Sequence, residues 1–340
     1  MAPRRPVEAA SAEERRVGDP ASEPRVPPLD GGGRRVLVTG SGGLLGSKLL
    51  AALTTHPHWV ALATGRQPER DPRLPAVPYF PCELRDAAAV ARLVAQAAPD
   101  VVIHTAAMTD VDGCERDPAA AWEQNVAVVE HLARACAAAG ALLVHLSTEY
   151  VFDGRRGPYR EEDPPNPLSV YGRTKLASEQ RVAALCPRWL VARTTVLYGY
   201  APTARPNFAL WLLDRLRRGE TPRVVADQIG SPTLADNLAA MLLALVAANA
   251  AGIVHTVGAT RISRLGFARQ LAATCGFEPE RVRPIATAEL GQPAPRPLDA
   301  GLVTARYEAL CPAVPPWPLP VALRYFRAQL DRERLLTTTP

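Results

Sequence analysis

A tyrosine and a lysine four residues apart carry the clearest chemical signal in the sequence. Residues 170–185 are expected to form a helix, which would place Tyr171 and Lys175 on one face. A free phenol has a pKa of roughly 10 and is a poor proton-transfer group at neutral pH. A neighbouring ammonium favours the phenolate and lowers that pKa. The pair therefore predicts a phenol that takes part in acid–base chemistry.

A second hydroxyl lies at the end of the strand that precedes this helix. Residues 142–147 are a short apolar run typical of a buried strand, and Thr148 follows directly. Its hydroxyl can hydrogen-bond a carbonyl or carbinol oxygen and hold the reacting carbon in place. The alternative interpretation of the Tyr171/Lys175 spacing is a half-buried aromatic beside an extended lysine. We predict that the catalytic residues are Thr148, Tyr171 and Lys175.

Three glycines predict a dinucleotide site near the beginning of the fold. Gly40, Gly43 and Gly46 lie between the apolar run 35–39 and the amphipathic stretch 44–53. The first permits a tight turn, the second lets the backbone approach a pyrophosphate, and the third lets the helix pack closely on the sheet. The phosphates would then meet free N–H groups at the amino end of the helix. A flexible loop is the alternative, but the strand-to-helix context is the one this motif requires. The predicted contacts here are Gly40, Gly43, Leu44, Leu45 and Gly46.

The residue after the second predicted strand bears on the choice of cofactor. Strand 59–64 is followed by Arg66, where an acidic residue would accept hydrogen bonds from the adenosine ribose and favour NAD. An arginine can instead pair with a 2′-phosphate. The sequence therefore favours NADPH, with NADH as the alternative. The other interpretation of Arg66 is an ordinary solvated arginine without a role in cofactor binding.

Further cofactor contacts are expected after the third and fourth strands and from the catalytic pair. An adenine contact is expected after strand 77–82, and small residues after strand 101–104 would let the cofactor lie against the backbone. Lys175 can donate to the nicotinamide ribose. These additional predicted contacts are Glu83, Leu84, Ala106, Ala107, Tyr171 and Lys175.

Strands alternate with helices along the first two thirds of the chain. Expected strands cover residues 35–39, 59–64, 77–82, 101–104, 142–147 and 189–195, and expected helices cover 44–53, 87–97, 119–139 and 170–185. This alternation predicts an α/β fold, a Rossmann-type doubly wound parallel sheet with a smaller C-terminal substrate-binding lobe.

The chain is expected to divide into three parts. Residues 1–33 lack apolar periodicity and are expected to form a disordered tail. Residues 34–200 would form the NAD(P)-binding Rossmann domain. Residues 201–332 would form mainly the substrate-binding lobe, although some of their strands and helices would return to the Rossmann core. Within the lobe we expect helices at 207–218, 234–248 and 264–275, strands at 223–226 and 253–257, and mostly loop at 284–320.

Composition argues against several classes of protein. No apolar run is long enough to span a membrane, and no Lys/Arg block alternates with aromatics as in many nucleic-acid-binding proteins. The six cysteines include no C-x-x-C pair and no metal-ligand cluster is visible, so reduced thiols and no metal are expected. The N-terminus lacks the apolar centre of a secretory signal, so the cytoplasm is the expected location. The oligomeric state is left open, with a homodimer as the candidate.

Ordered fragments over residues 34 to 330 resemble the dTDP-4-dehydrorhamnose reductase group of the extended short-chain dehydrogenases/reductases. The fragments that carry the resemblance include residues 36–40, 106–112, 147–154, 167–175 and 227–233. The resemblance implies NAD(P)H-dependent reduction of the 4-keto group of a nucleotide-linked 6-deoxysugar. It also implies that the substrate side includes Val111, Tyr150, Asn207, Gln228 and Arg296.

Departures from the family pattern leave two other functions open. Glu149 replaces the usual Asp, and Val196 stands where enteric-type members carry a Trp that borders the sugar. Residues 44–46 and 159–163 also resemble the regulatory beta subunit of methionine adenosyltransferase, a dinucleotide-binding partner protein. A nucleotide-sugar epimerase or dehydratase is the third interpretation. Arg66 argues against it because those enzymes retain NAD, and dehydratases need an acidic pair beside the catalytic Thr.

Overall fold

A seven-stranded parallel sheet lies at the centre of the computed structural model, which describes residues 33–336. The strand order is β11-β6-β5-β4-β1-β2-β3. The strands are β1 (Arg34–Thr39), β2 (Trp59–Gly65), β3 (Tyr79–Pro81), β4 (Val101–His104), β5 (Leu142–Thr148), β6 (Trp189–Thr194) and β11 (Gly252–His255). The chain winds outward in one direction from β1 to β3 and in the other from β4 to β6, so the winding reverses beside β1. A crevice at such a reversal is where doubly wound folds bind their ligands. The predicted Rossmann-type sheet is confirmed.

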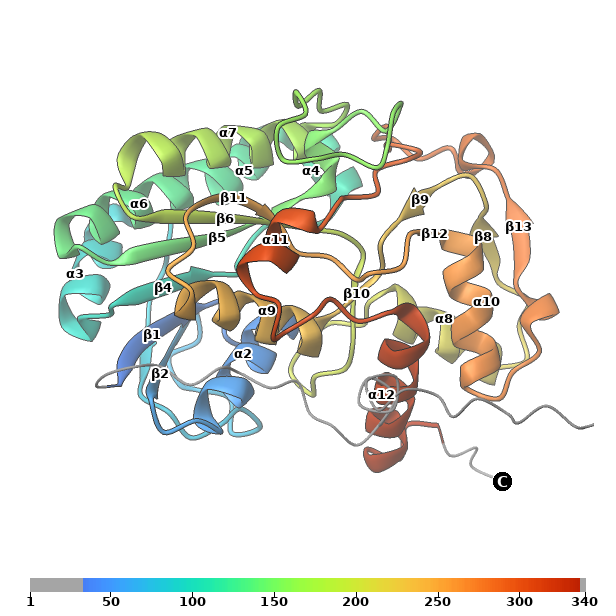
Figure 1. Ribbon diagram of the computed structural model, residues 1–340, viewed down its shortest axis with the longest axis horizontal. Helices are drawn as coiled ribbons and strands as arrows, with labels where there is room; N and C mark the ends of the chain where they lie inside the picture. Colours follow the sequence, from blue (N-terminus) through green and yellow to red (C-terminus); the bar gives the residue numbers. More distant parts are fainter. Residues whose placement is uncertain (1–32, 337–340) are drawn as a thin grey trace, which may run out of the picture.

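Helices cover both faces of this sheet, as Figure 1 shows. One face packs against α2 (Leu44–Thr54) and α9 (Ala235–Ala247), and the other against α3 (Ala87–Ala97), α6 (Val128–Ala139) and α7 (Val170–Leu185). Alternate residues of β1 point to opposite faces, so Val36 and Val38 join the first core and Leu37 the second. Burial on both faces explains why these strands are continuously apolar.

The C-terminal part builds a separate core beside the carboxyl ends of the strands. Helices α8 (Phe208–Arg217), α10 (Arg264–Thr274) and α12 (Leu319–Arg332) pack together there, at the right of Figure 1. Short strands join in pairs around them: β7 (Leu197–Tyr198) with β10 (Thr233–Leu234), β8 (Arg223–Val225) with β13 (Arg283–Ile285), and β9 (Ile229–Gly230) with β12 (Ile262–Ser263). Helix α9 and strand β11 leave this region and return to the main sheet.

Several elements differ from the sequence predictions. The expected helix 119–139 is α5 (Pro118–Trp122), a π-helical turn (Glu123–Ala127) and α6. The short helix α4 (Val111–Arg116) was not predicted, because six residues give too little periodicity. The expected loop 284–320 contains α11 (Ala305–Leu310) and the start of α12. The expected tail, residues 1–33, lies outside the described residues except for Gly33.

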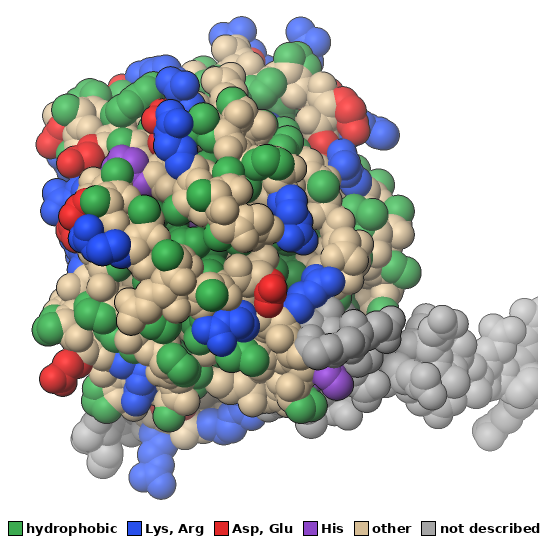
Figure 2. Space-filling model, turned by 90° about the vertical axis from the view of Figure 1, so that its left-hand side faces the viewer, with side chains coloured by type: hydrophobic (Ala, Val, Ile, Leu, Met, Phe, Trp, Pro, Cys, Tyr) green, Lys and Arg blue, Asp and Glu red, His purple; other side chains and the backbone are tan. Residues whose placement is uncertain are grey.

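Three further features bear on the expectations drawn from composition. Within residues 33–336, no helix is long and apolar enough to cross a membrane. On the face drawn in Figure 2, Lys and Arg side chains are scattered among other types and do not form one continuous field. The six cysteines are buried and unpaired.

A fully buried ion pair joins α7 to β6 behind the sheet's carboxyl edge. Arg193 Nε and Nη2 lie 2.9 and 2.7 Å from the two carboxylate oxygens of Glu179, and the side chains are 1% and 4% exposed. The Ser147 hydroxyl on β5 donates to the same carboxylate at 2.5 Å. One carboxylate therefore links three elements that carry or adjoin the predicted catalytic residues.

We predict that Arg193→Met strongly destabilises the fold. The Glu179 carboxylate would stay buried without its countercharge, which costs about 3–5 kcal/mol in comparable sites. Urea unfolding measures the change. Asp214→Asn is the control, because Asp214 on α8 makes an exposed pair with Arg218, the residue that follows the helix, and loss of this pair is expected to cost roughly 0.5 kcal/mol or less. Equal losses for the two variants would contradict the role given to the buried pair.

Candidate active site

The glycine turn after β1 has the shape that a pyrophosphate requires. Gly40 has φ +65°, and a Cβ on Gly46 would lie 2.3 Å from the Gly40 carbonyl oxygen, so α2 passes very close to the turn. Gly43 precedes α2 as its N-cap, without a side-chain capping bond and without an acidic residue in the first turn. The N–H groups of this helix end are therefore left for an anion, which fits the phosphates of a dinucleotide. Leu44 and Leu45 form the start of that helix.

The loops after β1 and β4 are in direct contact at the same edge. A Cβ on Gly40 would lie 2.9 Å from the Ala106 backbone nitrogen, and the Thr105 hydroxyl donates to the Thr39 carbonyl at 2.7 Å. Ala106 is half-buried and Ala107 is exposed. This close approach leaves no room for a side chain at Gly40.

The predicted adenosine-side residues lie where β2 and β3 end. Arg66 is exposed one residue beyond β2. Hydrogen bonds from Arg85 lower the pKa of the Glu83 carboxyl, and Arg66 adds a smaller electrostatic contribution. The Glu83 carboxylate thus pairs with Arg85 at 3.0 Å, and Leu84 packs against the core below α3 and α6.

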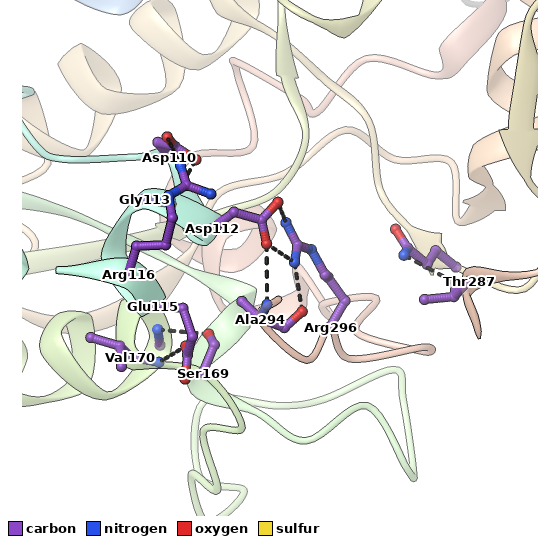
Figure 3. A network of polar contacts seen from close by, with 12 residues as sticks. Asp110, Asp112, Gly113, Glu115, Arg116, Ser169, Val170, Thr287, Ala294 and Arg296 are labelled. Atoms are coloured by element: carbon purple, nitrogen blue, oxygen red, sulfur yellow. Dashed lines mark hydrogen bonds and ion pairs between the residues drawn. The ribbon is translucent and has the colours of Figure 1, made fainter. Parts of the chain in front are cut away.

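Three contacts position Tyr171 as the second residue of α7. Ser169 caps the helix by accepting from the Gly172 N–H at 3.2 Å. The Glu115 carboxylate on α4 accepts from the Val170 N–H at 2.8 Å, as Figure 3 shows. A Cβ on Gly172 would lie 2.3 Å from the Tyr150 carbonyl oxygen, so only glycine lets the helix approach the segment after β5 this closely.

The structure brings Thr148, Tyr150 and Tyr171 together. Thr148 ends β5, and its side chain acts on the Tyr171 phenol by lowering its pKa, against the larger raising effect of burial. Tyr150, in a 3-10 turn (Glu149–Val151), stacks edge-on against Tyr171 with ring centroids 5.5 Å apart. The Thr148 and Tyr171 hydroxyl groups therefore lie in the same region, beside the Tyr150 ring.

Lys175 lies one turn along α7 from Tyr171, with its ammonium turned to a buried histidine. Lys175 Nζ lies 3.2 Å from His145 Nε2, and burial lowers its pKa to about 8. The expected lowering of the Tyr171 pKa by this ammonium is wrong for this structure. Burial raises the pKa of the phenol, and the Glu149 carboxylate raises it further. Tyr171 is thus a protonated donor at neutral pH.

Asn125 connects the loop after β4 to the catalytic helix from within the π-helical turn. Its amide oxygen accepts from the Met108 N–H at 2.8 Å, and its amide nitrogen lies 3.1 Å from the Met108 carbonyl and 3.2 Å from Thr174 Oγ1. Asn125 is fully buried within this turn. The sequence places Asn125 in the middle of an expected helix as a candidate for a backbone hydrogen bond near the active site, and the bonds to Met108 are of that kind.

A pocket lies between the segment after β5, at Glu149 and Tyr150, and the C-terminal lobe. Two of the predicted substrate residues, Tyr150 and Gln228, line it. Arg264 was missed, because an arginine at the start of a predicted helix looks like a solvated one. Its guanidinium lies 4.9 Å from the Phe208 ring centroid. Val196 also lines the pocket with φ +35°, a strained conformation for a β-branched residue.

The other predicted substrate residues, Val111, Asn207 and Arg296, do not line this pocket, and the last two have polar partners inside the chain. Arg296 pairs with Asp112 on α4, with its two terminal nitrogens 2.6 and 2.8 Å from the carboxylate oxygens, and Figure 3 shows this pair bridging two segments. Asn207 caps α8 and donates to the Gly199 carbonyl at 2.7 Å. Val111 is half-buried at the first position of α4. No group of three or more potential metal-binding side chains occurs among the described residues.

Comparisons with known proteins identify the family. The profile described as RmlD substrate binding domain matches residues 34–325. The sequence is 38% identical over 309 residues to dTDP-4-dehydrorhamnose reductase of Mycobacterium tuberculosis H37Rv, covering 89% of this chain and 93% of that protein. The chain belongs to the dTDP-4-dehydrorhamnose reductase (RmlD) family.

Other relatives of this RmlD-family chain bear on its cofactor and on the alternative interpretation as a regulatory subunit. The crystal structure of dTDP-4-dehydrorhamnose reductase from Bacillus anthracis in complex with NADP superposes with a TM-score of 0.75 at 28% identity, covering 87% of this chain and 99% of that one. Methionine adenosyltransferase 2 subunit beta of Danio rerio is 32% identical, covering 86% of this chain and 89% of that protein. The predicted resemblance to both groups is confirmed.

We predict that Gly46→Ala lowers the melting temperature and the NADPH affinity. Alanine normally stabilises a helix by about 1 kcal/mol relative to glycine. Here the new Cβ would clash with the Gly40 carbonyl 2.3 Å away, so the turn must move away from the phosphate position. Thermal melts with and without NADPH measure both effects. Gly42→Ala is the matched control, because no protein atom lies within 4 Å of its Cβ. A Gly46→Ala variant as stable as the wild type, with the same NADPH-induced shift, would refute the prediction.

Proposed function

We propose that this RmlD-family chain is an NADPH-dependent oxidoreductase that reduces the 4-keto group of a nucleotide-linked 6-deoxysugar such as dTDP-4-dehydrorhamnose. The observation that carries the proposal is the convergence of the Thr148 and Tyr171 hydroxyls at the edge of the sheet where the glycine turn lies. The named activities of the relatives and the NADP bound by one of them support it.

The residues of the glycine turn and Arg66 would hold the cofactor. The amino end of α2 offers its N–H groups to the pyrophosphate, and the exposed Arg66 guanidinium can reach a 2′-phosphate. NADPH supplies the hydride when bound. Lys175, buried beside the catalytic face of α7, would donate to the nicotinamide ribose.

The protein's part in the reaction is to place and protonate the carbonyl oxygen. Thr148 would donate a hydrogen bond to that oxygen and fix its position. Tyr171 would donate the phenolic proton from Oη as charge develops there. The raised pKa of the phenol keeps the proton on Tyr171 at neutral pH, which suits reduction, because the reaction consumes a proton.

The pocket beyond these hydroxyls would hold the sugar and its diphosphate. Tyr150 and Gln228 offer polar groups near the sugar, and the Arg264 guanidinium suits a phosphate. Val196 replaces the large aromatic of enteric-type members, so the pocket would be wider at this wall. We propose on this basis that the hexose preference differs from that of those members.

A non-catalytic regulatory subunit is the second candidate, favoured by the 32% identity to the methionine adenosyltransferase subunit. The complete set of Thr148, Tyr171 and Lys175 argues for catalysis instead. A dehydratase is less favoured, because Glu149 is followed by Tyr150 and supplies one carboxylate where a pair is needed. A cytoplasmic location and a homodimer stay predictions of the sequence.

We predict that Tyr171→Phe abolishes most turnover and leaves NADPH binding nearly intact. Loss of the proton donor is expected to lower kcat by about 10²–10⁴-fold, whereas the phenyl ring keeps its stacking against Tyr150. NADPH oxidation with a panel of dTDP-linked and other nucleotide-linked 4-keto-6-deoxysugars measures turnover, and fluorescence titration measures binding. Tyr307→Phe, at a buried tyrosine of α11 that bonds the Val314 carbonyl, is the control. Normal turnover by Tyr171→Phe would overturn the mechanism.

We predict that Arg66→Ala weakens NADPH far more than NADH. Only NADPH carries the 2′-phosphate that the guanidinium would pair with, and loss of such a charged hydrogen bond corresponds to about a tenfold to hundredfold rise in Kd. Titration of both cofactors measures the ratio. Arg85→Ala is the control, because this exposed arginine pairs with Glu83. Equal losses for both cofactors would remove the argument for NADPH.

A further inference from the structure

A buried carboxyl group is hydrogen-bonded to the hydroxyl of the proposed catalytic threonine. Thr148 Oγ1 lies 2.7 Å from Glu149 Oε2 and accepts from the Tyr150 N–H at 3.3 Å. Glu149 is only 7% exposed and lines the pocket. Its carboxyl group is thus placed next to a hydroxyl whose proton the reaction needs.

The direction of this hydrogen bond depends on whether Glu149 carries a proton. A threonine hydroxyl has a single proton, and an ionised carboxylate can only accept. With Glu149 ionised, Thr148 must donate to Glu149, and its oxygen presents only lone pairs to the pocket. A carbonyl oxygen in the pocket would then face another acceptor and find no donor at Thr148.

Protonation of Glu149 exchanges the donor and acceptor of its hydrogen bond with Thr148. The carboxylic acid can donate to Thr148 Oγ1, and the threonine proton is released to point into the pocket. That proton can then bond the substrate carbonyl beside the proton of Tyr171. Two donors on one oxygen are the arrangement that stabilises the charge developing during hydride transfer.

We propose that Glu149 is a positioning residue whose protonation turns the Thr148 hydroxyl toward the substrate, so that the chain reduces its ketone in the Glu149-protonated form. This inference rests on the proposed reductase function. Glu149 itself transfers no proton to the substrate in this scheme. It acts through Thr148.

The surroundings of Glu149 place this change near neutral pH. Burial raises the pKa of the carboxyl to about 7, against the opposing effects of the Thr148 hydrogen bond and of Arg264 on α10. The other titratable groups that face it are Tyr171 on α7 and Tyr150 beside it. Beyond them, Cys114 on α4 adjoins Tyr171, and Arg296, paired with Asp112, adjoins Tyr150. Both phenols have raised pKa values and stay neutral in this range.

The proposal predicts that kcat/KM falls as the pH rises. Below the pKa of Glu149 the acid form predominates and Thr148 is a donor, and above it activity falls tenfold per pH unit. Lys175, with a pKa of about 8, adds a second loss at higher pH. Together the two groups predict that kcat/KM falls about twentyfold from pH 6 to pH 8.

The test compares this profile in the wild type with that of Glu149→Gln. The glutamine amide donates to Thr148 at every pH, so only the loss due to Lys175 should persist, about twofold from pH 6 to pH 8. Glu149→Asp should keep a fall but move its midpoint, because the shorter acid sits differently against Thr148. Glu130→Gln, a carboxylate-to-amide change in a surface pair with Arg181, should reproduce the wild-type profile.

The possible results distinguish the Glu149 switch from the proposed reductase function. A flattened profile in Glu149→Gln together with a steep one in the wild type and in Glu130→Gln supports the switch. Parallel falls in wild type and Glu149→Gln overturn it and leave the reductase function standing. Absence of turnover by the wild type on every 4-keto sugar nucleotide at every pH overturns the proposed function and this inference with it.

Discussion

The packing of the amino end of α7 against the carboxyl end of β5 is the constraint on which the site depends. Gly172 permits contact with the Tyr150 carbonyl, the Glu115 carboxylate holds the first N–H of the helix, and the Glu179–Arg193 pair ties the same helix to β6 further along. A shift of about 1 Å here would separate the two hydroxyls by enough to cost much of their joint effect. The buried ion pair is expensive to desolvate, so its place beside the catalytic helix is consistent with a role in fixing geometry.

The same packing determines the electrostatics. Burial disfavours every charged form, so it raises the pKa of Tyr171 and Glu149 and lowers that of Lys175. Near neutral pH the two phenols are therefore neutral, Glu149 is close to its pKa of about 7, and Lys175, with a pKa of about 8, still carries its proton. In such a site the direction of each proton matters more than the strength of any single charge, because each hydroxyl has only one proton to donate.

The sequence was most informative where local pattern and chemistry coincide. The glycine turn lies between a strand and a helix, and Thr148, Tyr150 and Tyr171 meet because a parallel sheet brings its carboxyl ends to one edge. The sequence was least informative where long-range contacts decide. Helix α4 is too short for periodicity, Arg264 reaches the pocket through the pairing of β9 with β12, and the His145 contact of Lys175 depends on side-chain packing. The pKa of Tyr171 was mispredicted because spacing along a helix says nothing about burial.

The cofactor turn and the proton donors depend on different features of the chain, and this bears on how one fold serves both enzymes and binding partners. The glycine turn needs only backbone geometry, so a chain can keep a dinucleotide without any proton chemistry. Reduction requires in addition that the donors near β5 point into the pocket. In the mechanism that we propose, Thr148 and Tyr171 are these donors, and the protonation of Glu149 determines whether Thr148 can donate. A chain of this fold that lost the hydroxyl pair would keep its sheet and its cofactor turn, because neither the strand cores nor the Glu179–Arg193 pair uses Tyr171.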